Sequence, residues 1–300
     1  MIGPMIRIPC VIFTTLLMSA LIPLDSDQEG HDKQTDRSRN SKQMEYPAKN
    51  KDDYVVDDKK WNLVWADEFS GDELDLKNWT RQILPKPYNK EWQQYFDRKE
   101  NSYVKDGCLV LKAIHHSKKH GNQQYTSARL HTGCKHAWKY GKIAARIQLP
   151  YGKGIWPAFW MLGKDINEIG GTVPWPKCGE IDILELYGSR DDAVVECNLH
   201  YDDQGHKMMG VEKYKLKEGI FAEQFHVFEI EWDKHEMRWL VDGKKYHTAS
   251  IKDPALSEFH DEFYILLNIA VGGEHAGRPD DSTPFPQYMY VDWVRVYEEK

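Results

Sequence analysis

The stretch EIDILE at Glu180–Glu185 places three carboxylates in one short run of aliphatic residues. Such a run is typical of a half-buried β-strand, in which side chains alternate between two faces. Glu180 and Asp182 are then expected on one face, whereas strict alternation would turn Glu185 toward the opposite, apolar face. A β-bulge at position 183 or 184 would return Glu185 to the face of the other acids, and bulges are frequent beside active sites.

The arrangement of these acids indicates a type of reaction. Retaining glycosidases carry two carboxyl groups about 5 to 5.5 Å apart, whereas inverting enzymes need a wider gap for water. Two glutamates that lean toward each other on a concave sheet favour the retaining geometry. Asp182 between them would raise at least one pKa, because like charges discourage simultaneous ionisation. The alternative is a solvated strand face, which explains neither the third acid nor the tryptophan-rich run upstream.

The composition limits the kind of ligand. The chain has 300 residues, 41% hydrophobic and 12% aromatic, which is enough for a sizeable core in one or two domains. The net charge of −7 and the pI near 6.0 give no electrostatic footprint for nucleic acid or an anionic membrane. Eleven tryptophans and sixteen tyrosines supply flat faces of the kind that stack on sugar rings, beside those expected in the core.

The first sixty residues differ in composition from the rest. Arg7 precedes an apolar run over 8–24, which predicts a signal peptide at 1–24. A membrane anchor is disfavoured because the run is short and contains two prolines. Residues 25–60 are rich in charged and polar side chains and predict a flexible charged linker. We therefore expect a secreted, periplasmic or cell-surface protein with no membrane span after signal removal.

Four cysteines lie beyond the predicted leader, at Cys108, Cys134, Cys178 and Cys197. An even number in an exported protein permits disulfides, with three possible pairings. A zinc site is disfavoured because no closely spaced Cys/His set occurs. Strand alternation places Cys178 and Cys197 on opposite faces, which argues against joining them. Free buried thiols and disulfides both remain open.

From Trp61 onward, short strand-like runs are separated by Gly, Pro, Asn and Asp, and long amphipathic helices are missing. The predicted strands are 109–114, 143–149, 180–186, 194–201, 225–232, 238–241, 264–271 and 290–297. Many short strands with frequent turns over 61–300 predict a single all-β sandwich or barrel.

Motifs along this domain form a known pattern: Trp65–Phe69, Tyr125–Leu130, Tyr140–Ile143, Gly154–Gly163, Gly179–Glu185 and Val291–Tyr297. Together they resemble glycoside hydrolase family 16, specifically the bacterial laminarinase-like endo-β-1,3-glucanases. The resemblance implies a β-jelly-roll sandwich of two curved antiparallel sheets with a concave substrate cleft over 61–300. It also implies cleavage of β-1,3- or mixed β-1,3/1,4-glucan, such as laminarin, by double displacement. A monomer is expected, with the polysaccharide as its partner.

The resemblance also implies roles at matching positions. Glu180 would be the nucleophile, Asp182 its electrostatic partner, and Glu185 the acid that later acts as base. The implied sugar contacts are Trp156, Trp160, Trp175, Arg129, His200 and Gln287. Structural alternatives stay open, since one of the tryptophans could belong to the core and Arg129 could pair with an acid.

No cofactor is expected for catalysis, but the resemblance implies a structural calcium ion on the convex side of the sandwich. The matching positions are Glu68, the carbonyl of Gly107, and Asp292. Oxygen ligands of this kind suit a hard cation. Composition and spacing alone would not reveal the site, because the three residues are scattered along the chain.

Two loops bear on the choice of substrate. The loop over 272–279 lacks a tryptophan that relatives commonly carry, and the insertion over 165–173 could reshape the cleft. Lys90, His275 and Arg278 could instead recognise an acidic galactan, because agarases, porphyranases and carrageenases share the bulged motif. A protein of another class, a glucan-binding module with little turnover, is the remaining alternative.

Overall fold

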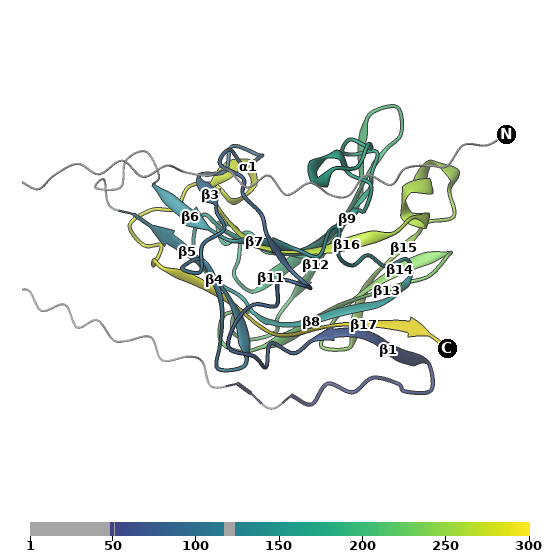
Figure 1. Ribbon diagram of the computed structural model, residues 1–300, viewed down its shortest axis with the longest axis horizontal. Helices are drawn as coiled ribbons and strands as arrows, with labels where there is room; N and C mark the ends of the chain where they lie inside the picture. Colours follow the sequence, from purple (N-terminus) through teal and green to yellow (C-terminus); the bar gives the residue numbers. More distant parts are fainter. Residues whose placement is uncertain (1–48, 51, 117–123) are drawn as a thin grey trace, which may run out of the picture. The chain divides into compact units, whose positions relative to one another are not determined.

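The computed structural model describes residues 49–50, 52–116 and 124–300, which belong to one compact unit. The predicted signal peptide lies outside the described residues, as does most of the predicted linker. Two β-sheets lie face to face and contain almost all of the regular structure (Figure 1). In the described part of the chain, no helix has the length and apolar character needed to span a membrane.

One sheet has ten strands. They are β1 (Trp61–Asp67), β3 (Gln93–Tyr95), β4 (Ser102–Lys105), β5 (Cys108–His115), β6 (Tyr125–Ser127), β8 (Gly141–Gln148), β13 (His226–Trp232), β14 (Glu236–Val241), β15 (Lys244–Ser250) and β17 (Gln287–Glu299). The order is β15-β14-β13-β8-β17-β5-β6-β3, with β1 beside β17 and β4 beside β5. The pairs are antiparallel apart from β3 with β6.

The second sheet has seven strands. They are β2 (Thr80–Arg81), β7 (Arg129–His131), β9 (Ile155–Gly163), β10 (Glu180–Glu185), β11 (Val194–Asp202), β12 (His206–Lys215) and β16 (Phe263–Val271). The order is β12-β11-β10-β9-β16-β7-β2. Short helices complete the fold: η2 (Asn167–Ile169), η3 (Pro254–His260) and α1 (Gly273–Ala276). The loops with η2 and α1 rise at opposite ends of this sheet (Figure 1).

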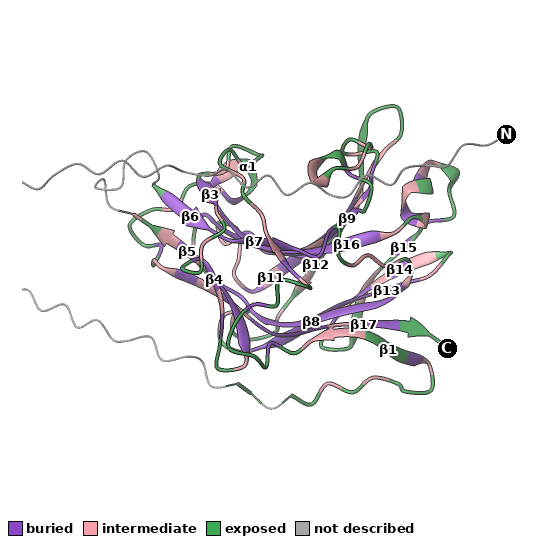
Figure 2. Cartoon of the chain, viewed as in Figure 1, coloured by how far each residue is buried: buried purple, intermediate pink, exposed green. Residues whose placement is uncertain are grey.

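The core lies between the sheets because each contributes one apolar face. Ile181 and Leu184 of β10 belong to the same buried cluster as Phe228 and Trp239 of the ten-stranded sheet. Buried residues follow the central strands of both sheets, such as β8 and β16 (Figure 2). Burying each large aliphatic or aromatic side chain stabilises the fold by about 1.5 to 3 kcal/mol. The prediction of an all-β jelly-roll sandwich with two antiparallel sheets is confirmed.

The eight predicted strands overlap β5, β8, β10, β11, β13, β14, β16 and β17. The strands that the prediction misses include β9, a central strand that contains Pro157, and β12, an edge strand whose side chains are mostly exposed. Proline cannot donate to a strand ladder, so it argues against a central strand from sequence. In the structure, the carbonyl of Pro157 still accepts from the Leu186 N–H at 3.2 Å.

Ordered packing begins before the predicted domain boundary at residue 61. The Tyr54 ring lies 5.1 Å from the Trp293 ring, and its hydroxyl donates to Glu229 at 2.5 Å. Asp52 accepts a hydrogen bond from the Trp293 indole at 3.0 Å. This segment therefore contacts the outer face of the ten-stranded sheet.

No disulfide joins the cysteines within the described ranges. Cys197 lies in the main core, whereas Cys178 packs with Leu162 and Tyr264 on the other side of the seven-stranded sheet. The two thiols therefore lie on opposite faces, as strand alternation predicts.

Candidate active site

A β-bulge in β10 brings the three acids to one face. Asp182 lies opposite Trp160 of β9, but Leu184 lies opposite the preceding residue, Phe159, so Ile183 is the extra residue. On the other side, β11 shows the matching shift. The indole of Trp239, from the ten-stranded sheet, donates to the Asp182 carbonyl at 2.9 Å. The predicted bulge is confirmed, and its extra aliphatic side chain packs into the core.

Glu180 and Asp182 share one histidine. The His200 Nε2 atom lies 3.2 Å from Asp182 Oδ2 and 3.8 Å from Glu180 Oε1. The indole of Trp175 donates to Glu180 Oε2 at 2.8 Å. Asp182 is only 2% exposed. One imidazole therefore contacts two neighbouring carboxyl groups, one of which is almost fully buried.

Glu185 is buried yet fully engaged in hydrogen bonds. It accepts from Trp156 Nε1 at 2.8 Å, from the Tyr187 hydroxyl at 3.0 Å and from Asn198 Nδ2 at 2.9 Å. These donors come from β9, from the segment after β10 and from β11, so they fix the carboxyl from three directions. Glu185 consequently points toward these donors and not into the hydrophobic interior.

The three carboxyl groups have raised pKa values. Burial is the largest cause and raises the pKa of Glu180, Asp182 and Glu185 to about 8. The negative charge of Asp182 is the next cause for Glu180 and for Glu185. Interacting acids titrate as a group, and such a group retains protons at neutral pH.

Beside the acids, Trp160 presents a half-buried ring. Its indole donates to Asn268 Oδ1 at 2.7 Å, and the Arg129 guanidinium lies 4.7 Å from the ring centre. Arg129 is buried and lies 3.3 Å from both carboxylate oxygens of Glu168 in η2. The 165–173 insertion therefore supplies the counter-ion of Arg129. Pairing of Arg129 with an acid was one of the alternatives that the sequence left open.

The other predicted sugar contacts lie in different surroundings. Trp175 is 44% exposed next to Glu180, whereas Trp156 is buried and holds Glu185. Gln287 lies on β17 in the opposite sheet, where its amide binds the backbone of Tyr151 and Pro284 at 3.3 and 2.6 Å. The structure thus brings the two tryptophans to the acids, but it gives Gln287 contacts with loop backbone.

The residues predicted to bind calcium do not form a cation cage. The Gly107 carbonyl accepts from Lys49 Nζ at 2.8 Å, and the same ammonium pairs with Asp292. Glu68 instead forms a two-pronged ion pair with Arg295 at 2.7 and 2.9 Å. These oxygens are already bound to the chain's own cations, so the residues do not fit a calcium ion in this arrangement.

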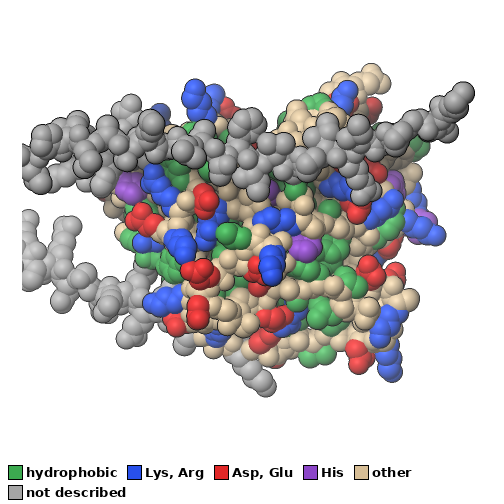
Figure 3. Space-filling model, viewed as in Figure 1, with side chains coloured by type: hydrophobic (Ala, Val, Ile, Leu, Met, Phe, Trp, Pro, Cys, Tyr) green, Lys and Arg blue, Asp and Glu red, His purple; other side chains and the backbone are tan. Residues whose placement is uncertain are grey.

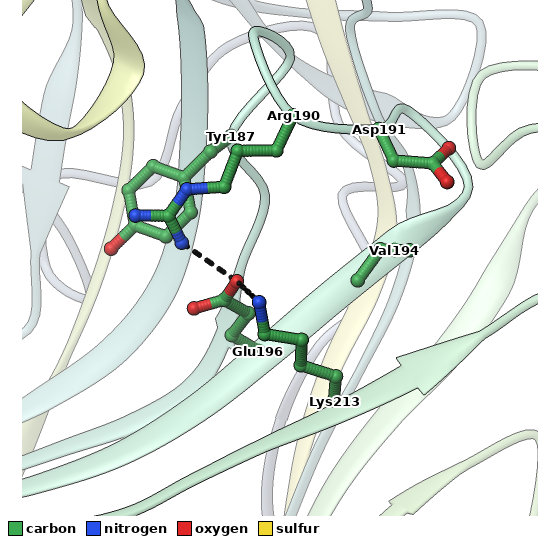
Figure 4. Close-up of a pocket in the computed structure, with 6 residues that line it drawn as sticks. All are labelled: Tyr187, Arg190, Asp191, Val194, Glu196 and Lys213. Carbon is green, nitrogen blue, oxygen red and sulfur yellow. Dashed lines mark hydrogen bonds and ion pairs between the residues drawn. The ribbon is translucent and has the colours of Figure 1, made fainter.

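A pocket of about 120 Å³ is lined by Tyr187, the donor to Glu185, by residues within 190–196 and by Lys213 (Figure 4). Glu196, the residue opposite Glu185 on β11, pairs there with Arg190 at 2.7 Å and with Lys213 at 3.0 Å. The guanidinium of Arg190 lies 4.3 Å from the centre of the Tyr187 ring. This pocket carries fixed cations around a buried acid, unlike the cluster on β10.

Sequence reasoning did not select Tyr187, Asn198 or Glu168 as site residues. Asn198 shares strand parity with His200, and Tyr187 lies two residues after Glu185, so both carried a local signal. Glu168 carried none, because its contact with Arg129 depends on how the insertion folds.

A two-sheet β-sandwich with three carboxyl groups gathered on one bulged strand defines a jelly-roll glycoside hydrolase. The family model of glycosyl hydrolases family 16 matches residues 88–295. The chain belongs to this family.

Similar proteins and similar solved structures support this family membership. The chain is 36% identical over 266 residues to glucan endo-1,3-beta-glucosidase A1 of Niallia circulans, covering 80% of this chain but 38% of that protein. It is 36% identical over 248 residues to beta-glucanase of Rhodothermus marinus, covering 79% and 85%. The laminarinase catalytic domain of Thermotoga petrophila RKU-1 superposes with a TM-score of 0.70 at 43% identity, covering 81% of this chain and 99% of that chain.

Proposed function

We propose that the chain is a retaining endo-β-1,3-glucanase that acts on laminarin-like glucan. The observation that carries this proposal is the bulge at Ile183, which gathers Glu180, Asp182 and Glu185 on one face. Membership of glycosyl hydrolases family 16 and similarity to endo-1,3-glucanases and laminarinases support it.

In this proposal, Glu180 attacks the anomeric carbon while Glu185 donates a proton to the leaving oxygen. Glu185 then removes a proton from water, which releases the sugar from its ester with Glu180. The raised pKa of Glu185, about 8, suits a group that must be protonated at the start of the cycle. Glu180 must react as a carboxylate, and His200 Nε2 lies 3.8 Å from Glu180 and 3.2 Å from Asp182, where it can stabilise their negative charge.

Aromatic side chains next to the acids would orient the glucan. Trp175 combines an exposed ring with a hydrogen bond to Glu180, so a sugar stacked on it would lie beside the nucleophile. The half-buried ring of Trp160 offers a second platform, because Arg129 and Asn268 hold its orientation.

The charged loop residues give no support to a sulfated galactan as substrate. Lys90 pairs with Glu274 at 2.6 Å, and the Arg278 guanidinium lies 5.5 Å from the centre of the Trp92 ring. These two cations therefore have partners within the chain. Acidic and basic side chains are also interspersed on the face shown in Figure 3, without a large patch of one sign.

The test is reducing-end release from laminarin, lichenan, agar and carrageenan by the wild-type chain, Glu180→Gln and a matched control, Glu212→Gln, on the exposed face of β12. We expect release from laminarin by the wild type and the control but not by Glu180→Gln. Release only from agar or carrageenan would refute the glucan assignment, and no release from any substrate would favour a binding module.

We also propose that residues 1–24 are removed on export and that the mature protein is a secreted, periplasmic or cell-surface monomer. The apolar run after Arg7 supports the first part of this proposal. The amino-terminal sequence of protein from the medium and its elution volume in size-exclusion chromatography would test both parts.

A further inference from the structure

We propose that His206 is a positioning residue that selects the tautomer of His200. His206 begins β12, and its Nε2 atom lies 2.9 Å from His200 Nδ1. The two ring planes are nearly parallel, with an interplanar angle of 17° and centres 5.1 Å apart. The effect on turnover rests on the proposed function, but the tautomer itself does not.

Asp182 Oδ2 is buried and, as a carboxylate oxygen, needs a donor. Within the described residues no hydrogen bond satisfies it, and the nitrogen that pairs with it is His200 Nε2, 3.2 Å away. A neutral imidazole protonates only one of its nitrogens. A neutral His200 that donates from Nε2 must accept at Nδ1, so His206 then donates its own Nε2 proton.

The opposite tautomer would place a lone pair of His200 against two carboxyl groups. When Asp182 is a carboxylate, such an arrangement would leave its Oδ2 unsatisfied, and a buried polar atom without a partner is costly. The titratable groups around His200 are Glu180, Asp182, Glu185, His206 and His275. Since Glu180, Asp182 and Glu185 can carry negative charge, they too favour a proton on Nε2.

His206 also contacts Trp175, the second residue that holds the proposed nucleophile Glu180. Its ring lies 4.6 Å from the Trp175 ring, whose indole donates to Glu180. A packing role and a hydrogen-bonding role therefore predict different outcomes for two substitutions. His206→Phe keeps an aromatic ring but has no donor, whereas His206→Gln loses the ring but retains an amide donor.

The experiment combines nitrogen NMR of the histidine rings with kinetics on laminarin at several pH values. We expect Nδ1 of His200 to be unprotonated in the wild type and in His206→Gln, and protonated in His206→Phe. We expect kcat to fall roughly tenfold in His206→Phe, with an altered pH profile, and to fall much less in His206→Gln. The reverse order of activities, or a proton on Nδ1 in the wild type, would overturn the proposal.

The NMR measurement needs no turnover. If the wild type hydrolyses none of the substrates, the proposed function fails while the tautomer of His200 is still determined.

A second and independent observation concerns Lys49 on the outer face of the ten-stranded sheet. We infer that its ammonium takes the place of a divalent metal between Gly107 and Asp292. Lys49 Nζ contacts both oxygens, and Arg146 pairs with the same carboxylate. Arg146 also donates to the backbone and side-chain oxygens of Asn50 at 2.6 and 2.9 Å, which fixes the residue next to Lys49.

Charge supports this inference. Asp292 is only 8% exposed and already has two cations, so little negative charge is left to bind a divalent ion. Glu68, the remaining acid of the expected set, is held by Arg295. A calcium ion would have to displace Lys49 and separate Glu68 from its guanidinium.

Thermal unfolding of the full chain tests this inference. We expect neither EDTA nor calcium to move the Tm of the wild type by more than about 1 °C, and Lys49→Met to lower it by several degrees. The matched control is Lys99→Met, which removes a cation from an exposed ion pair with Glu73. A Tm raised by calcium in the wild type, or a Lys49→Met variant that melts like the wild type, would refute it.

Discussion

Two groups of buried and half-buried acids, one on each sheet, have opposite surroundings. Glu229 and Glu231 of β13 lie on the outer face of the ten-stranded sheet, and Lys142 pairs with both at 3.0 and 3.2 Å. Glu180 and Asp182 of β10 have only a histidine as their ion-pair partner in the described part of the chain. Fixed cations therefore compensate one group and not the other.

The difference appears in the direction of the pKa shifts. Burial alone would raise the pKa of Glu231, but Lys142, Lys60 and Arg238 bring it below its ordinary value. Burial of Glu180 is reinforced by the charge of Asp182, and the pKa rises to about 8. Buried acids with fixed cations hold a structure together, whereas buried acids without them can exchange protons with a substrate.

The largest expected effect is the loss of turnover in Glu180→Gln. The amide keeps the shape of the side chain and the contact with Trp175 but cannot form the glycosyl ester. We expect kcat on laminarin to fall by roughly 10⁴-fold or more. Glu231→Gln is the matching change in the group that is paired with cations, and this variant should keep its turnover. An equal loss of kcat in both variants would show that the two groups of acids do not differ in catalytic role.

The next largest effect distinguishes the role of Glu185 from that of Glu180, the other glutamate on β10. Glu185→Ala should reduce hydrolysis of laminarin by roughly 10²- to 10⁴-fold, because general acid catalysis of that size is lost. An aryl glucoside with a good leaving group needs no proton at departure, so its glycosylation rate should fall much less. Equal losses on both substrates in stopped-flow assays would contradict the role of Glu185 as the acid.

The face shared by these acids could be predicted from sequence because it depends on local alternation. Six consecutive residues suffice to show that Glu185 needs a bulge to join Glu180, and the structure has that bulge. Strands with regular alternation, such as β11, are predictable for the same reason. The strand β9 escapes such prediction because Pro157 interrupts its pattern, although neighbouring strands on both sides hold it in the sheet.

Contacts between distant segments could not be predicted. Arg129 and Glu168 are 39 positions apart, and Lys49 and Asp292 are 243 apart. Residue type shows that Arg129 needs an acid or a ligand, but it does not show which one the folded chain supplies. The same limit applies to Gln287, whose amide binds the backbone 136 positions away at Tyr151.

A third prediction concerns stability in the compensated group. Lys142→Met leaves Glu229 buried without its cation, and breaking such a pair costs about 3 to 5 kcal/mol of unfolding free energy. We expect a clearly lower denaturation midpoint in urea with unchanged turnover per folded molecule. The double variant Lys142→Met, Glu229→Gln should recover part of the lost unfolding free energy. If Lys142→Met alone is as stable as the wild type, the Lys142 cation is dispensable.

The smallest effect is a difference in the pH dependence of stability. A carboxyl group with a folded pKa above its unfolded pKa keeps its proton in the folded state while the unfolded chain ionises, so stability falls as pH rises between about 4 and 8. Glu180→Gln removes this penalty and should gain stability over the wild type, on the order of 1 to 2 kcal/mol at pH 8, with little gain at pH 4.

Glu231 has the opposite sign, because its folded pKa lies below its ordinary value. Its contribution is present above the unfolded pKa of about 4.3 and is lost as pH falls through the folded pKa. Glu231→Gln should therefore be less stable than the wild type at pH 7, and this deficit should shrink toward pH 3. Urea titrations from pH 3 to pH 8 measure how the stability difference between each variant and the wild type changes with pH. Changes of the same sign in Glu180→Gln and Glu231→Gln would show that fixed cations do not distinguish the two groups of acids.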